Sequence, residues 1–360
     1  MADPSSSSSV AAAPKVELHL HLDGAVRPST VWDLAKKRGI KVPGATAEEM
    51  TSFIRNVEMG SLPKFLDTFS IFLPPMVGDK DALRRVSYEL CEDKAREGVV
   101  YFETRFNPQL LIYPETEGDK ETRITTRDVM QGIVQGIQEG QRDFNVKARL
   151  IICTARERPS WAAECLQLCQ EFSDFVVGLD IANCGGVDET EGEDVQVHPE
   201  IVRVFQEAER CGIHRTAHAG EDGPASNVKE AIELLKAERI GHGYHALDDD
   251  AIYQMVKDKG IHLETCPTSS VYTGACDKDF TKHPCVRFIK DRISISLNTD
   301  DPTVFGNTIN DEYEIAKKYF ALSDEQAVQL TLNTARASFL PEQEKLELVE
   351  QLRAAYHVTD

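Results

Sequence analysis

Short β-rich runs alternate with amphipathic helical segments along most of this chain, and this alternation restricts the fold more than any other feature. The runs cover residues 16–22, 99–106, 147–154, 175–182, 213–219, 239–243, 261–267 and 293–299. The segments between them carry apolar residues at helical spacing, and several end in Gly. Strict alternation predicts parallel strands with helical crossovers. Eight such units are the number that closes an α/β barrel of the (β/α)8 TIM type, and a doubly wound open sheet is the main alternative.

Additional helices are expected at two places. Residues 28–78 separate the first run from the second and should form helices over one end of the barrel, and three segments within residues 310–356 should form C-terminal helices. Residues 1–14, which include a serine run, are predicted to form a disordered N-terminal arm. Because no linker-like stretch follows, residues 15–360 are predicted to form a single barrel domain.

The charge balance narrows the class of ligand. Apolar residues make up 41% of the chain and charged residues 28%, which is ordinary for a soluble globular protein. The formal net charge is -20, so the surface should repel nucleic acid and anionic lipid. A neutral or cationic small molecule is the ligand class that fits best. The sequence indicates no protein partner, and a monomer is compatible with it.

Cysteine usage and the N-terminus indicate a compartment. The nine cysteines are dispersed and form no C-x-x-C pair, which favours a reducing environment over a disulfide framework. Residues 1–14 have no basic segment followed by an apolar one, and no stretch is long and apolar enough to span a bilayer. We therefore expect a cytoplasmic protein without membrane insertion.

Imidazole and carboxylate groups gather at the ends of four of the predicted strands. In residues 15–24, KVELHLHLDG, leucine and valine alternate with ionisable side chains, so that His19, His21 and Asp23 share one face. A solvent-exposed strand face is the simple explanation for such a pattern. In an α/β barrel, however, functional groups lie where strands end.

The other three strand ends supply the remaining polar candidates: His218 and Glu221 at the fifth, His242 at the sixth, and Asp300 with Asp301 at the eighth. Imidazole and carboxylate suit a divalent metal such as zinc, although any single histidine is more often structural. Gly220 allows a turn that could aim Glu221 into the barrel mouth, and the glycines beside His242 permit close backbone approach. Together these groups predict a metal site at one rim.

Two other motifs are weaker. Residues 241–246, with Glu264 further on, loosely match a dinucleotide-binding pattern, but the preceding segment is too charged for the required strand. His262 and Glu264 followed by Cys285 resemble part of a cytidine-type deaminase signature. That signature needs a second cysteine where Phe288 stands.

Four motifs in order, VELHLHLDG, TAHAGEDG, ERIGHGYH and SLNTDDP, resemble the adenosine deaminase branch of the amidohydrolase-type barrels. With the lesser matches EGVVYFETRFNPQLL and TCPTSS, the resemblance extends from about Lys15 to Pro341. It implies zinc-dependent hydrolysis of adenosine and 2'-deoxyadenosine to inosine and deoxyinosine, with release of ammonia. The implied cofactor is one zinc ion per chain, and the implied partner is a small-molecule nucleoside.

The resemblance also implies residue roles. Zinc would be held by His19, His21, His218 and Asp300, with Asp300 also orienting the attacking water and His21 also contacting substrate. His242 would act as a base or electrostatic stabiliser, and Glu221 would protonate purine N1. Asp301 would hydrogen-bond N7, and Asp23 would hydrogen-bond the ribose 5'-hydroxyl. A carboxylate at Asp23 disfavours a 5'-phosphate.

The resemblance leaves two alternatives open for each of two regions of the substrate pocket. An apolar helix face made by Leu62, Phe65, Leu66 and Phe69 would cover the pocket, unless that face simply packs on the barrel. The family usually has a glycine after the fourth strand whose backbone N–H meets the purine, but this chain has Asn183 there. Either Asn183 supplies that N–H, or the following loop brings Gly185 or Gly186 into position.

Other functions remain open at this point. The chain could deaminate adenine or an N6-substituted AMP instead of adenosine. It could also be a non-catalytic nucleoside-binding relative. A metal-dependent amide or phosphoester hydrolase on the same barrel is a third alternative, but two-metal forms tend to use a bridging lysine, and residues 175–182 contain none.

Overall fold

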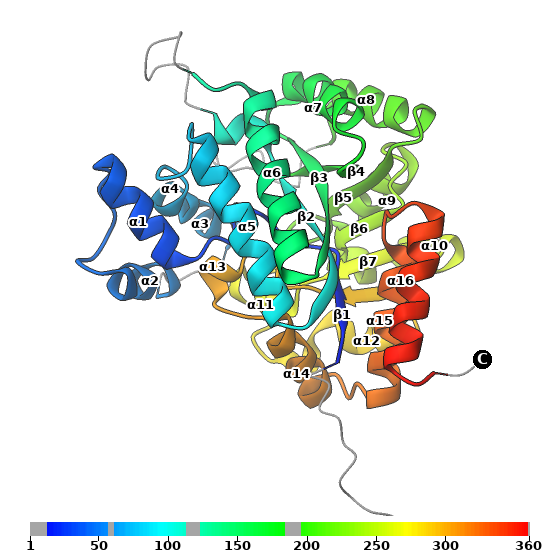
Figure 1. Cartoon of the computed structure of the whole chain (residues 1–360). Helices are drawn as coiled ribbons and strands as arrows, with labels where there is room; N and C mark the ends of the chain where they lie inside the picture. Colours follow the sequence, from blue (N-terminus) through cyan, green and yellow to red (C-terminus); the bar gives the residue numbers. More distant parts are fainter. Residues whose placement is uncertain (1–12, 57–60, 113–122, 184–195, 359–360) are drawn as a thin grey trace, which may run out of the picture.

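The computed structural model describes residues 13–56, 61–112, 123–183 and 196–358, and within them eight parallel strands follow one another in order around a barrel (Figure 1). The strands are β1 (Lys15–Glu17), β2 (Val99–Phe106), β3 (Lys147–Ala155), β4 (Val176–Ala182), β5 (His214–Ala219), β6 (Arg239–His242), β7 (His262–Thr265) and β8 (Ile295–Leu297). Each strand pairs in parallel with the next. The (β/α)8 barrel is confirmed, and the doubly wound sheet is excluded because the strands keep their sequence order around the ring.

The first strand is shorter than predicted, and the reason is a side chain that comes from far along the chain, just after β8. β1 ends at Glu17, and only isolated parallel bridges continue it, one of them between Leu20 and Asp300. Between these segments, Oδ1 of the buried Asn298 accepts hydrogen bonds from the backbone N–H groups of Leu18 at 2.9 Å and His19 at 3.1 Å. A carboxamide therefore takes the place of strand pairing where the barrel closes.

The helices cover the outside of the barrel. They are α1 (Pro28–Arg38), α2 (Ala47–Arg55), α3 (Leu62–Asp67), α4 (Phe69–Phe72), α5 (Lys80–Arg96), α6 (Thr126–Phe144), α7 (Ala162–Glu171), α8 (Pro199–Arg210), α9 (Ala225–Glu233), α10 (Asp250–Lys259), α11 (Pro267–Tyr272), α12 (Pro284–Lys290), α13 (Pro302–Phe305), α14 (Ile309–Tyr319), α15 (Asp324–Ala337) and α16 (Glu342–Ala355). Helices α1 to α4 gather on one side of the barrel and α16 lies on the other (Figure 1). The predicted inserted and C-terminal helices are thus present, whereas α11, α12 and α13 are too short to leave a periodic pattern.

Local sequence explains where several helices begin. Thr125 accepts a hydrogen bond from the backbone of Asp128, whose carboxylate accepts one in return from the backbone N–H of Thr125, and this reciprocal pair starts α6. Ser323 and Gln326 form the same arrangement at the start of α15. Such pairs satisfy backbone N–H groups that a helix cannot bond internally.

The interior of the barrel is charged. Most α/β barrels fill this space with branched apolar side chains. Here the inward-facing charged residues are buried to 1% exposure or less, and they include Glu103, Arg105, Asp180, Arg239 and Glu264. Tyr101, two residues before Glu103 on β2, shares its face and donates a 2.8 Å hydrogen bond to it, and Tyr101 clusters with Leu18 and residues of α15 and α16. Because buried charges require partners, this interior fixes the positions of many side chains at once.

The ends of the chain add two observations. The predicted arm lies outside the described residues, except for Ala13 and Pro14, and the Pro14 carbonyl accepts a 2.6 Å hydrogen bond from Tyr356. Among the helices that the structure describes, none combines the length and the apolar character needed to cross a bilayer.

Replacing Asn298 with Ala should weaken barrel closure. The change removes bonds to Leu18 and His19 and two further bonds that Nδ2 donates to the Thr265 carbonyl and Ser296 Oγ, each 3.0 Å long. Buried backbone groups left without partners cost about 1–3 kcal/mol each, so we expect the free energy of unfolding to fall by about 3 kcal/mol or more. Urea denaturation followed by circular dichroism measures this. Asn333→Ala, on the surface-facing side of α15, is the control and should change it by less than about 1 kcal/mol. Equal effects of the two changes would contradict the assignment.

Candidate metal centre and active site

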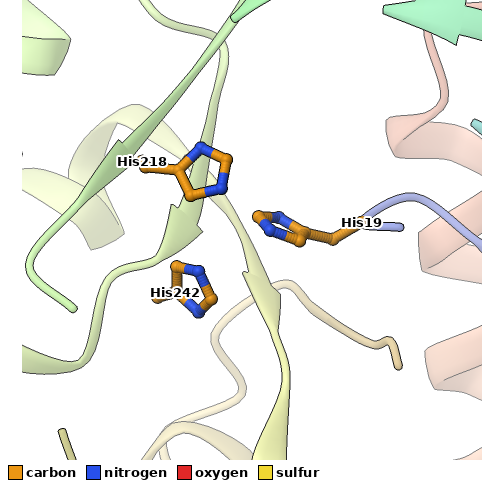
Figure 2. A group of neighbouring side chains, drawn as sticks. All are labelled: His19, His218 and His242. Atoms are coloured by element: carbon orange, nitrogen blue, oxygen red, sulfur yellow. The ribbon is translucent and has the colours of Figure 1, made fainter. Parts of the chain in front are cut away.

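Three histidines from different strands meet at one end of the barrel. His19 follows β1, His218 lies on β5 and His242 ends β6, and their rings converge (Figure 2). The ring centroid of His19 lies 4.6 Å from that of His218 and 4.7 Å from that of His242. All three are at most 6% exposed, so a solvent-exposed strand face does not explain the pattern.

Asp300 and His21 complete this cluster. Asp300 Oδ1 lies 3.2 Å from His19 Nε2 and 3.4 Å from His21 Nε2, and the Nε2 atoms of His21 and His218 are 3.2 Å apart. Yet His19 Nε2 and Asp300 Oδ1 are buried and have no hydrogen-bond partner among the described residues. Buried polar atoms that face one another without bonding are expected where a cation is shared between them.

The donor set fits a divalent metal ion. Three overlapping groups have ligand atoms within 4.8 Å of one another: His19, His218 and His242; His19, His21 and Asp300; and His242, Cys266 and Asp300. The four predicted ligands therefore lie together. Cys266, which immediately follows β7, is a further donor that the sequence reasoning did not name.

Backbone conformation supports a functional role for this cluster. His242 has φ 67° and Asp300 has φ 64°, both in the left-handed region that non-glycine residues rarely adopt. Such conformations are retained where the surrounding structure enforces them, commonly at active sites. Close packing adds to this, since a Cβ on Gly241 would lie 2.8 Å from His19 Cε1. Gly220, with φ 66°, makes the turn that was predicted before Glu221.

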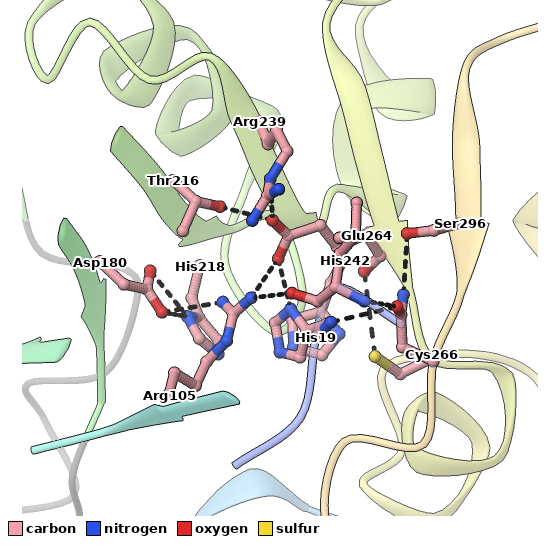
Figure 3. Close-up of polar contacts among 12 residues, drawn as sticks. His19, Arg105, Asp180, Thr216, His218, Arg239, His242, Glu264, Cys266 and Ser296 are labelled. Atoms are coloured by element: carbon pink, nitrogen blue, oxygen red, sulfur yellow. Dashed lines mark hydrogen bonds and ion pairs between the residues drawn. The ribbon is translucent and has the colours of Figure 1, made fainter. Parts of the chain in front are cut away.

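A second layer of charges orients the histidines (Figure 3). Glu264 lies 2.7 Å from Nδ1 of His19, and Asp180 lies 3.1 Å from Nδ1 of His218. Arg105 joins the two carboxylates, at 2.8 Å from Asp180 and 2.7 Å from Glu264. An Nδ1–H that donates to a carboxylate leaves Nε2 free to face a metal.

Sequence reasoning missed this second layer. Arg105 and Asp180 lie within the predicted strands 99–106 and 175–182 and were given no role, and Glu264, within residues 261–267, was considered only in the two weaker motifs. The available signal was an ionisable residue on the inward face of an otherwise apolar strand. That signal does not reveal which strand supplies the partner.

Two adjacent aspartates have pKa values displaced in opposite directions. Burial would raise the pKa of Asp300, but the facing His19, His242 and His21 outweigh it and hold that pKa well below its usual range. Burial and the nearby carboxyl groups of Asp300, Asp23 and Glu221 raise the pKa of Asp301 well above its usual range. Burial also raises the pKa of Asp23 to about 6 and lowers that of His242 well below its ordinary value.

Beside the cluster lies a cavity with about 730 Å³ of empty space, a volume that includes its opening to solvent. Its lining contains His21, Asp23, Leu62, Phe65, Leu66, Phe69, Asn183, His218, Glu221, His242, Asp300 and Asp301, so every predicted site residue except His19 borders it. His19 lies behind this wall with no exposed surface. The lining also includes Leu73, Asn107, Leu110, Cys153 and Ala182, which were not predicted.

Glu221 faces the cavity next to the histidine cluster. It is 5% exposed, and its Oε2 lies 3.4 Å from Nε2 of His242. Thr273 donates a 3.5 Å hydrogen bond to the other carboxylate oxygen. A carboxyl group therefore stands within reach of any ligand that approaches the histidine cluster.

The apolar helix face that was expected to cover the pocket differs in detail from the prediction of one helix. The four predicted residues line the cavity, but they belong to two short helices, α3 and α4, which meet at Thr68. The ring of Phe65 stacks on that of Phe305 at 5.1 Å between centroids. Asn183 borders the cavity as expected, whereas the alternatives Gly185 and Gly186 lie outside the described residues.

Comparisons with known proteins agree with this geometry. The sequence profile of the family described as adenosine deaminase matches residues 14–355. An adenosine deaminase of Xenopus tropicalis is 45% identical over 348 residues, which cover 95% of this chain and 96% of that protein.

Solved structures share the fold. The crystal structure of an adenine deaminase from Arthrobacter aurescens superposes with a TM-score of 0.82 at 26% identity and covers 96% of this chain and 100% of its own. An amidohydrolase from Burkholderia ambifaria with bound Zn has a TM-score of 0.79 at 27% identity, covering 97% and 93%. The family profile and the curated relatives, together with a histidine and aspartate cluster whose donor atoms are close enough to share a metal ion, show that this chain belongs to the adenosine deaminase family.

Proposed function

We propose that this protein catalyses the hydrolytic deamination of adenosine and 2'-deoxyadenosine to inosine and deoxyinosine, with one zinc ion per chain. The observation that carries the proposal is the convergence of Glu221 and the histidine cluster on one acid-lined cavity. Relatives that share 45% of its residues over nearly the whole chain are adenosine deaminases, which supports the choice of reaction.

The proposed zinc ligands are His19, His21, His218 and Asp300. Imidazole nitrogens with a carboxylate oxygen form a donor set that zinc favours, and the amidohydrolase from Burkholderia ambifaria carries Zn. When bound, zinc would supply Lewis-acid activation of water at neutral pH. Glu264 and Asp180 would hold the rings of His19 and His218 in the tautomer that this requires.

The residues around the cavity would then divide the proton transfers. Asp300 and His242 would accept the proton that water loses as its oxygen bonds to C6 of the purine. Glu221 would donate a proton to N1, which makes C6 more electrophilic and stabilises the tetrahedral intermediate. The proton accepted from water would pass to the amino nitrogen as its bond to C6 breaks, and the C6 hydroxyl would return a proton to Glu221, which gives ammonia and the C6 carbonyl of inosine.

The cavity walls favour a nucleoside over a nucleotide. Asp23, Glu221, Asp300 and Asp301 all border the cavity, and no lysine or arginine is among the described residues that do so. A 5'-phosphate would meet like charge without a counterion. Asp23 would instead bond the 5'-hydroxyl. Asp301 would bond purine N7, to which a protonated carboxyl group can donate.

We also infer a cytoplasmic location. No disulfide joins the cysteines that the structure describes, and most of them are buried. Reduced thiols in apolar surroundings are typical of a reducing compartment.

Glu221→Gln should remove the proton donor while leaving the metal centre intact. We expect kcat for adenosine to fall by about 10²–10⁴-fold, measured by the ultraviolet change as adenosine becomes inosine. Zinc content should stay at one per chain by elemental analysis. Asp222→Asn, an exposed carboxylate in the same loop, is the matched control and should turn over normally. Tight adenosine binding by the wild type without ammonia release would instead favour the non-catalytic alternative.

Removal of zinc by a chelator should abolish activity, and added zinc should restore it. His19→Ala should lower zinc content below one per chain because it deletes a buried donor at the centre of the cluster. His357→Ala, at an exposed position after α16, should keep its zinc. Full activity in a metal-free preparation, or two metal ions per chain, would contradict the assignment.

The order of kcat/KM among the candidate substrates tests whether the acidic cavity wall selects a nucleoside. Wild-type protein should prefer adenosine to AMP, and Asp23→Asn should lower kcat/KM for adenosine by about tenfold or more because a hydrogen bond to a charged group is lost. The same change should reduce the ratio of kcat/KM for adenosine to kcat/KM for AMP. Rates on adenine and N6-methyl-AMP in the same assay complete the ranking, and a higher kcat/KM for either would overturn the choice of substrate.

A further inference from the structure

Two asparagines line the active-site cavity, and they are used differently. The side chain of Asn107 forms hydrogen bonds with the protein backbone. Its Nδ2 donates to the Cys153 carbonyl at 2.9 Å, and its Oδ1 accepts from the Leu110 N–H at 3.1 Å. Asn183 makes no such bonds with the rest of the described chain. Its Oδ1 is buried and has no hydrogen-bond partner within the described part of the chain. A polar atom that is removed from water but left unbonded at a cavity wall calls for a partner from the ligand.

The two residues before Asn183 contact neighbouring parts of the barrel through their backbone. The carbonyl of Ala182 accepts a 2.9 Å hydrogen bond from the N–H of Arg156, and the carbonyl of Ile181 lies 3.2 Å from Nδ1 of His218. The residue is thus tied to the neighbouring strand β3 and to a proposed metal ligand. What remains adjustable is the carboxamide, which can turn about its last side-chain bond to meet a ligand.

Barrel topology places Asn183 opposite Asp301. Asn183 follows β4 and Asp301 follows closely after β8, and these strands lie four positions apart in a ring of eight. Both residues border the same cavity. In the proposed function, the purine presents C6 to the histidine cluster and N7 to Asp301. Its other edge, which carries N3, then faces the wall formed by β4.

On a nucleoside in the extended (anti) conformation, N3 and the ribose 2'-hydroxyl lie on the same side of the glycosidic bond. N3 accepts a hydrogen bond and the hydroxyl can donate one. A carboxamide offers both a donor and an acceptor, so it complements this pair. The backbone N–H of Asn183 could meet N3 alone, but that contact would leave the side-chain oxygen unused.

We propose that Asn183 accepts a hydrogen bond from the ribose 2'-hydroxyl through Oδ1 and makes the site selective for ribonucleosides over 2'-deoxyribonucleosides. The inference rests on the proposed deaminase function and refines it, since both nucleosides remain substrates. With 2'-deoxyadenosine the buried oxygen would stay unpaired, and sites built to bond a substrate hydroxyl discriminate against analogues that lack it.

Comparing kcat/KM for adenosine, 2'-deoxyadenosine and 3'-deoxyadenosine tests this. Wild-type protein should favour adenosine over 2'-deoxyadenosine by about tenfold. Asn183→Ala should remove that preference by lowering kcat/KM for adenosine, with 2'-deoxyadenosine changed by about twofold or less. Asn183→Asp keeps an acceptor oxygen and should retain the preference. The ratio between adenosine and 3'-deoxyadenosine should not respond to either change.

Leu66→Ala is the matched control, since it alters the cavity wall without touching a polar group and should lower both rates equally. An unchanged adenosine to 2'-deoxyadenosine ratio in Asn183→Ala would overturn the inference. So would equal kcat/KM for the two nucleosides in the wild type, which leaves the deaminase function standing. Failure of zinc-loaded wild type to turn over either nucleoside would refute the proposed function itself.

Discussion

Most of this structure depends on the hydrogen bonds and ion pairs that the buried carboxylate of Glu264 makes. It has no exposed surface, and it accepts bonds from Arg105 and Arg239 at 2.7 Å each and from Thr216 at 2.9 Å, while lying 2.7 Å from His19 Nδ1. Arg239 also pairs with Glu103 and packs 3.6 Å from the centre of the Phe339 ring. Loss of one member would leave buried charges unpaired, which costs about 3–5 kcal/mol. The same atoms therefore stabilise the barrel and aim a proposed metal ligand, so fold and site share one network.

Adjacent aspartates illustrate how surroundings assign chemical roles. Asp300 faces imidazole rings and Asp301 faces other carboxyl groups, and this contrast alone separates their pKa values. Residues one step apart in sequence thus become, in the proposed reaction, a charged proton acceptor and a neutral hydrogen-bond donor. Divergent environments for paired carboxyl groups are a general means of running acid and base chemistry in one site.

Much of the fold and of the site could be predicted because both follow local rules. Eight strands appeared from alternation, and strand-end histidines and aspartates identified the rim. The second layer could not be predicted in this way, because pairing Arg105 with Asp180 and Glu264 requires the register between strands. The early end of β1 depends on Asn298, 280 residues away from Leu18. The break between α3 and α4 at Thr68 leaves the apolar spacing unchanged, so spacing alone predicts one continuous face.

The hydrogen bonds that Asn298 accepts from Leu18 and His19 also constrain the order of events during biosynthesis. A ribosome delivers His19 and His21 long before the chain that contains Asn298 and Asp300 has emerged. Until then the segment after β1 cannot pair with the segment that follows β8. His19 also lacks its contact with Asp300 and the hydrogen bond from its backbone N–H to Asn298. Long-range closure of this kind is slow relative to local helix formation. Assembly of the complete histidine and aspartate cluster is therefore a late step that awaits the last quarter of the polypeptide.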